Sequence, residues 1–128
     1  MRGQLMPALD FALTLERRAN GTTVLVLAGE LDLYRAPEIE RALVDAIEPE
    51  WDPGQGARRV VVDLRAVTFL DSTTLALLLA ASGRQRARGG DLLVLVGPQT
   101  PTTAFEITGF DRLLPIRHAD PDPTGRAA

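Results

Sequence analysis

The sequence contains no cysteine, which excludes disulfide bonds and thiolate metal sites. It also contains no lysine, so its 14 basic residues are all arginines, and it contains a single histidine. No cluster of histidine and carboxylate side chains occurs at metal-ligand spacing, and no glycine-rich phosphate-binding motif is present. The formal net charge is -3 with both signs interspersed, whereas a nucleic-acid-binding protein normally shows a basic patch. We therefore expect a protein that uses no cofactor and binds no nucleic acid directly.

Long hydrophobic runs are absent as well. No apolar stretch approaches the ~20 residues that a membrane-spanning helix needs, and residues 1–10 lack the apolar region of a secretory signal. Aromatic residues make up only 5% of a chain that is 45% hydrophobic, so the core must be built from aliphatic side chains. A length of 128 residues suits one compact domain. These features predict a soluble cytoplasmic domain with no membrane partner.

The order of the apolar patterns predicts an α/β domain. Asn20-Gly21 is a strong hairpin signal, so the first two strands should pair antiparallel. After that hairpin, apolar strands alternate with helical patterns, which implies right-handed crossovers and a mixed, mostly parallel sheet. The predicted order is β-β-α-β-α-β-α-β. The predicted strands cover residues 11–18, 22–28, 59–64, 92–96 and 114–117, and the predicted helices cover residues 37–48, 73–88 and 101–108.

Three of these segments carry a prediction of burial. The four leucines between residues 75 and 79 leave little polar face, so the first half of that helix should be buried. The continuous valine run at residues 60–62 predicts a central strand, covered on both faces or at least parallel to its neighbours. In the first helix, one apolar stripe recurs at helical spacing. This stripe consists of Ile39, Ala42, Leu43, Ala46 and Ile47.

We assign residues 11–118 to a single domain, residues 1–10 to an N-terminal extension and residues 119–128 to a disordered tail rich in proline and aspartate. The Pro/Gly-rich segment 50–57 is predicted to be a loop. Trp51 in that loop is expected to fold back over the edge of the core, with contact to a partner as the alternative.

The segment that could carry chemistry is the junction between the third predicted strand and the next helix. Sites in open α/β sheets gather where strands end and helices begin, and Ser72 lies at such a junction. Asp71 or Ser72 would cap the helix, with Thr73 and Thr74 in its first turn, and the tripeptide alone favours an ordinary cap. A hydroxyl there nevertheless lies beside unpaired N–H groups and the positive end of the helix dipole, which suit a phosphate. Phosphorylation would change the surface charge without unfolding the domain.

Four ordered segments of the chain are Gly29-Glu30-Leu31-Asp32, Val61-Val62-Asp63-Leu64, Phe69-Leu70-Asp71-Ser72-Thr73 and Thr108-Gly109-Phe110-Asp111. In this order and spacing they resemble the STAS domain family, in particular the bacterial anti-sigma factor antagonists. Each motif is weak singly, but the ordered set in its strand–helix context is specific. The resemblance covers roughly residues 13–117 and implies a single STAS-like domain.

The resemblance also implies a phosphorylation switch. In such antagonists the serine that follows the aspartate of the D-S-[ST]-G motif is phosphorylated by the anti-sigma factor, which is also a kinase, and a phosphatase removes the phosphate. That serine corresponds to Ser72. The unphosphorylated form captures the anti-sigma factor and frees the sigma factor, and the phosphorylated form lets go. The same match places Asp32 close to Ser72 and makes Asp32, Asp71, Ser72, Thr73 and Thr74 the partner-binding residues. Asp63 is expected to be structural.

The sequence departs from the family's pattern at several points. Thr74 stands where the motif has glycine, so the backbone of a partner would meet a side chain there. Arg-Ala-Pro at residues 35–37 replaces the usual small or hydroxyl residues, and the loop 50–57 is longer than typical. Many relatives end in a further helix, which Pro121 and Pro123 argue against here.

Two other functions stay open. The domain could be a non-phosphorylated interaction or ligand-sensing module of a larger signalling assembly, which Thr74 favours somewhat. A serine hydrolase has less support, because Ser72 lacks a G-x-S-x-G elbow and His118 adjoins the predicted tail. We expect His118 to be an exposed surface residue and the protein not to be an enzyme.

Overall fold

The computed structural model describes residues 11–47, 58–109 and 112–119. The predictions for residues 1–10, for the loop 50–57 with Trp51, and for the tail beyond Ala119 lie outside these described residues. The elements follow the predicted order, with one short 3-10 helix in addition. They are β1 (Phe11–Arg17), β2 (Thr22–Leu31), η2 (Leu33–Arg35), α2 (Ala36–Ile47), β3 (Arg59–Leu70), α3 (Ser72–Ala87), β4 (Asp91–Val96), α4 (Thr103–Thr108) and β5 (Ile116–His118).

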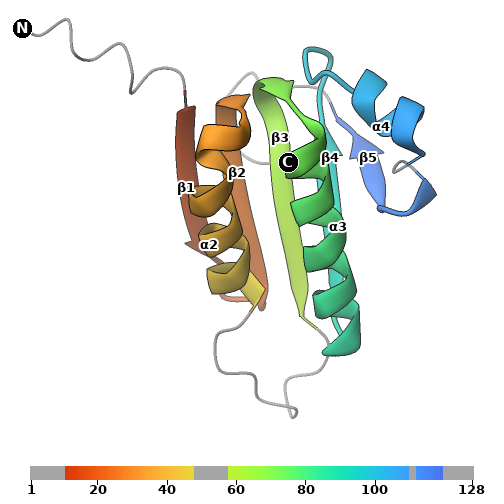
Figure 1. Cartoon of the computed structure of the whole chain (residues 1–128). Coiled ribbons are helices and arrows are strands. Elements are labelled where there is room, and N and C mark those ends of the chain that lie inside the picture. Colours follow the sequence, from red (N-terminus) through yellow and green to blue (C-terminus); the bar gives the residue numbers. More distant parts are fainter. Residues whose placement is uncertain (1–10, 48–57, 110–111, 120–128) are drawn as a thin grey trace, which may run out of the picture.

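The five strands form one mixed sheet in the order β1-β2-β3-β4-β5. β1 pairs antiparallel with β2, and the remaining neighbours are parallel. Each new strand is added on the same side, so right-handed crossovers place the connecting helices on one face of the sheet. Figure 1 shows α2 and α3 side by side on that face. The valine run in β3 predicted a central strand that is covered on both faces or at least parallel to its neighbours. The observed β3 is central and parallel to both of its neighbours, β2 and β4.

The β1–β2 turn forms as predicted, and all of β1 pairs with residues 23–29 of β2. Gly21 has a φ of +90°, a left-handed conformation that glycine adopts without steric cost. The side chain of Asn20 accepts a hydrogen bond of 3.1 Å from the Thr22 amide. Local sequence therefore specifies this turn.

The core lies between the sheet and the helices α2 and α3, and it is mainly aliphatic, as the composition predicts, with Phe105 as its buried aromatic residue. All five residues of the predicted stripe on α2 are buried. On α3 the burial prediction is only partly right, because Leu75 and Leu78 are fully buried while Leu77 and Leu79 are half-buried. Only one face of α3 packs on the sheet. Each fully buried leucine contributes about 1.5–3 kcal/mol, so this packing holds α3, and Ser72 with it, against the sheet.

β3 extends beyond the predicted end at Leu64 and continues to Leu70. The register of β3 against β2 shifts twice, and each shift inserts one extra residue into β3. The buried residues Leu64, Val67 and Leu70 consequently recur every third residue in this part of the strand. A regular strand alternates with a period of two, so the predicted end was wrong because the bulges hide the pattern. β2 likewise runs past its predicted end, to Leu31.

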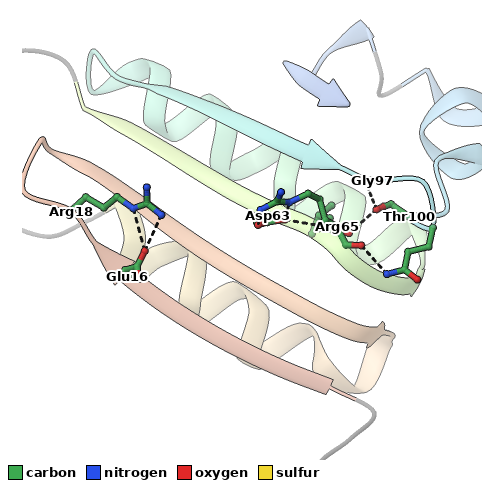
Figure 2. A network of polar contacts seen from close by, with 8 residues as sticks. Glu16, Arg18, Asp63, Arg65, Gly97 and Thr100 are labelled. Atoms are coloured by element: carbon green, nitrogen blue, oxygen red, sulfur yellow. Dashed lines mark hydrogen bonds and ion pairs between the residues drawn. The ribbon is translucent and has the colours of Figure 1, made fainter. Parts of the chain in front are cut away.

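Side chains from the β4–α4 connection satisfy the backbone of β3 beyond its pairing with β4, which ends at Asp63. Thr100 Oγ1 donates to the Leu64 carbonyl at 2.7 Å, and Gln99 Nε2 donates to the Arg65 carbonyl at 3.2 Å. Figure 2 shows this network near the middle of β3, where its pairing with β4 ends. These bonds hold the carboxyl-terminal half of β3, which leads into α3.

Asp63 and Arg65 form an ion pair on β3 that is largely withdrawn from solvent (Figure 2). The two side chains are 11% and 14% exposed, and Arg65 Nη2 lies 2.8 Å from Asp63 Oδ2. The carboxylate also accepts bonds of 3.0 Å from Nε and from the backbone amide of Arg65. These contacts give Asp63 the structural role expected from the sequence.

Candidate functional site

The predicted site residues lie at the carboxyl ends of two neighbouring parallel strands. Leu31 of β2 and Leu70 of β3 are the last paired residues, so Asp32 and Asp71 each follow a paired position directly. Neighbouring strands lie about 4.8 Å apart. The sheet register therefore brings Asp32 and the turn that carries Ser72 to the same edge of the sheet.

Each of the two aspartates caps the helix that follows it. Asp71 Oδ1 accepts a hydrogen bond of 3.0 Å from the Thr74 amide and is the N-cap of α3. Asp32 Oδ1 accepts a hydrogen bond of 3.0 Å from the Tyr34 amide and is the N-cap of η2. Of the two cap candidates in the sequence, Asp71 is thus the cap, and Ser72 is the first helical residue. Each carboxylate satisfies an amide that the start of a helix leaves unpaired. The Asp71 bond fixes the turn around Ser72, and the Asp32 bond fixes the start of η2.

Ser72 is exposed, whereas the residues that follow it in the first turn of α3 are increasingly covered. Thr73 is half-buried, and Thr74 is fully buried at 0% exposure. The prediction that Thr74 contacts a partner is wrong for its side chain, because Thr74 points inward and donates to the Leu31 carbonyl at 3.2 Å. The accessible hydroxyl groups of this turn are therefore those of Ser72 and, in part, Thr73.

Three large apolar side chains close in sequence to the two capping aspartates are exposed, and we call them the apolar rim. Leu33 and Tyr34 of η2 are 61% and 86% exposed, and Phe69 near the end of β3 is 47% exposed. They lie within two residues of the capping aspartates Asp32 and Asp71. Single exposed apolar residues are common, but a group of them at one edge marks an interaction surface.

The apolar rim is not predicted from the sequence. The STAS-like motif contains Phe69 but gives it no role, and Leu33 and Tyr34 belong to none of the four motifs. The position of Leu33 and Tyr34 in the sequence could have indicated their exposure. Both lie between Asp32, which follows β2, and the helix that begins near Pro37, and neither belongs to the buried apolar stripe of that helix. Large apolar residues in such a connection are candidates for partner contact.

The described part of the chain is informative about metal-ligand clusters and about the position of His118. No three His, Asp or Glu side chains there are grouped as metal ligands. His118 is exposed on β5, as predicted, and β4 lies between that strand and β3. Among the described helices, none has the length and apolar character required to cross a membrane.

The comparison with protein families agrees with this architecture. A family model described as "Mlab, STAS domain" matches residues 14–115. The chain belongs to the STAS domain family. The matched part of this STAS domain agrees closely with the range of roughly 13–117 inferred from its motifs.

Relatives of this STAS domain are named as anti-sigma-B factor antagonists. The antagonist of Listeria monocytogenes is 25% identical over 122 residues, which cover 94% of this chain and 100% of the relative. The antagonist of Staphylococcus aureus is 30% identical over 90 residues, which cover 70% of this chain and 78% of the relative. Both alignments span most of the two chains that they compare.

Solved structures share the fold. An anti-sigma factor antagonist from Mycobacterium paratuberculosis superposes with a TM-score of 0.68 at 24% identity, covering 89% of this chain and 88% of that one. The anti-sigma factor antagonist SpoIIAA in its unphosphorylated form gives a TM-score of 0.64 at 24% identity, covering 88% and 90%. The predicted fold class, a single STAS-like α/β domain, is thereby confirmed.

Proposed function

We propose that this STAS domain is an anti-sigma factor antagonist, which captures an anti-sigma factor, frees a sigma factor and is switched off by phosphorylation of Ser72. The observation that carries the proposal is the exposed position of Ser72 at the first residue of α3, at the edge of the sheet where β2 and β3 end, with the exposed apolar rim close in sequence to that edge. It is a binding protein rather than an enzyme, and it acts in the cytoplasm through protein contacts alone. The partners are an anti-sigma factor with serine kinase activity and a phosphatase that acts on phospho-Ser72.

The geometry of the turn suits a phosphate on the domain itself. The first turn of a helix presents unpaired N–H groups and the positive end of the dipole, where an anion is stabilised. Asp71 already bonds the Thr74 amide inside the turn, so the cap stays formed while the Ser72 side chain extends into solvent. Phosphorylation adds about -1.5 to -2 charges there without disturbing a buried contact.

The same phosphate opposes partner binding. Glu30, Asp32 and Asp71 already supply negative charge at this edge of the sheet, and a dianion beside the apolar rim adds to it. A partner that covers the rim would have to bury that dianion without a matching cation, which is costly. Names of structural neighbours support the type of switch, since SpoIIAA has been solved in both an unphosphorylated and a phosphorylated form.

Phosphorylation of Ser72 can be tested directly. We expect incubation with ATP and a cognate anti-sigma kinase to add one phosphate to the wild-type chain, located on Ser72 by mass spectrometry. The variant Ser72→Ala should bind the same kinase and take up no phosphate, while Thr73→Ala should still be modified. If Ser72 stays unmodified with every anti-sigma factor that binds, the switch does not operate in this protein.

The apolar rim should carry much of the affinity for the anti-sigma factor. An exposed tyrosine at the centre of an interface typically contributes about 2 kcal/mol or more to binding, so Tyr34→Ala should weaken the complex at least tenfold in a titration. The matched control is Ile107→Ala on α4, because Ile107 is 79% exposed and Tyr34 is 86% exposed. Neither change should lower the melting temperature. Equal losses of affinity in the two variants would show that the rim is not the contact surface.

A further inference from the structure

Thr74 makes more polar contacts than a residue that only fills space would need. Its side chain is fully buried, and Oγ1 lies 3.2 Å from the Leu31 carbonyl oxygen and 3.3 Å from Asp71 Oδ1. Its amide donates to the same carboxylate oxygen at 3.0 Å. One residue in the first turn of α3 is thus bonded both to its own helix cap and to the end of β2.

The bond to Leu31 lies at the last residue of β2 that the sheet pairs with β3. The β2–β3 ladder ends at Leu31 opposite Leu70. The next residue after Leu31 is Asp32, which holds η2 through its side chain to the Tyr34 amide and through its carbonyl to the Arg35 amide, at 3.0 and 2.9 Å. The Thr74 hydroxyl therefore ties the start of η2, which carries two residues of the apolar rim, to the helix that begins with Ser72.

We infer that Thr74 is a positioning residue that holds Ser72 and the apolar rim in one fixed arrangement, so that a single partner surface can engage both. A hydroxyl has one proton, so Thr74 shares it between the Leu31 carbonyl and the Asp71 carboxylate. The Leu31 bond fixes η2, and the Asp71 bond fixes the helix start. A surface held in its binding arrangement before contact loses less conformational entropy when a partner binds. The value of this arrangement for binding rests on the proposed function.

A matched pair of variants separates positioning from packing. Thr74→Val keeps the shape of the side chain and removes the hydroxyl, whereas Thr74→Ser keeps the hydroxyl and removes a methyl group. If Thr74 only filled space, the valine variant would behave as wild type and the serine variant would carry the defect. If the hydroxyl positions the two segments, the serine variant should behave as wild type and the valine variant should carry the defect.

Hydrogen exchange of the whole chain tests the connection without any partner. In Thr74→Val we expect the Tyr34 and Arg35 amides to exchange at least tenfold faster than in wild type, with Thr74→Ser close to wild type. The Val94 amide, bonded to the Pro115 carbonyl in the sheet, should be unchanged in both. Thr74→Ala, which also lacks the hydroxyl, should repeat the valine result. Faster exchange confined to α3, or a uniform increase at Val94 as well, would overturn the inference.

Binding to the anti-sigma factor then tests what the connection is for. We expect Thr74→Val to bind about tenfold more weakly and Thr74→Ser to restore the affinity. If wild type binds no anti-sigma factor, the proposed function fails, while the exchange experiment still decides whether Thr74 couples the two segments. If wild type binds and the loosened Thr74→Val variant binds equally well, the proposed function survives and the positioning role is wrong.

Discussion

Replacement of Ser72 by aspartate is expected to lower the affinity for the anti-sigma factor about 100-fold, or about 2.7 kcal/mol at 25 °C. The introduced carboxylate would be covered by the partner next to Asp32 and Asp71, where no matching cation is supplied by this chain's own turn. The domain itself should be as stable as wild type, since an acidic residue in the first turn of a helix interacts favourably with the dipole. Calorimetric titration of both proteins measures the difference.

Two control variants show whether the added charge at position 72 causes the loss of affinity. Ser72→Ala should retain the wild-type affinity, which separates the added charge from the lost hydroxyl. Ala80→Asp adds the same charge at an exposed position of α3, about 12 Å further along the helix axis, and should bind as wild type. Unchanged affinity of Ser72→Asp would instead favour the second reading of the sequence, a constitutive interaction or ligand-sensing module.

Removal of the Arg65 side chain should strongly destabilise the fold. In Arg65→Ala the Asp63 carboxylate, whose side chain is only 11% exposed, loses two of its charged donors. Breaking a buried ion pair on one side typically costs about 3–5 kcal/mol. We expect a loss of that size in the free energy of unfolding from urea titration, with an unchanged dependence on denaturant.

The ion pair of Arg59 and Asp91 is a matched control that tests whether burial makes the Asp63–Arg65 pair important for stability. These residues form the same type of contact, at 2.9 Å, but their side chains are 55% and 52% exposed. The hydrogen bond and the negative charge of Asp91 raise the pKa of Arg59 above its ordinary value, yet an exposed ion pair stabilises a fold very little. Arg59→Ala should therefore leave the unfolding midpoint nearly unchanged. The double variant Asp63→Asn with Arg65→Met should recover much of the Arg65→Ala loss, and failure to recover would mean that the ion pair is not the cause.

Local patterns explain which elements could be predicted. The stripe on α2 and the turn at Gly21 depend on residues close together in the chain, and both were predicted correctly. The end of β3 was not, because two bulges change the spacing of its buried residues to three. A bulge depends on how a strand pairs with its neighbour. Its position therefore cannot be predicted from the sequence of one strand.

At the candidate site, too, local features could be predicted from the sequence, whereas features that depend on contacts between distant segments could not. The motif that carries Ser72 was visible in the sequence, and its position at a strand–helix junction follows from the order of the elements. The direction of Thr74 was not visible, since a threonine in a first turn is equally compatible with facing solvent or facing β2. The exposure of Tyr34 was not predicted either, because exposure of a large apolar side chain is a property of the assembled surface.

The order of strands and helices, the mainly aliphatic composition of the core and the place of Ser72 follow from the amino-acid sequence, because they depend on periodicity and on short motifs within one segment. The resemblance to the family also implied that Asp32 lies near Ser72. The bond from Thr74 to Leu31 and the exposure of Leu33, Tyr34 and Phe69 are known only from the three-dimensional structure. Leu31 and Thr74 are 43 positions apart in the chain, and their contact is set by strand register and helix packing.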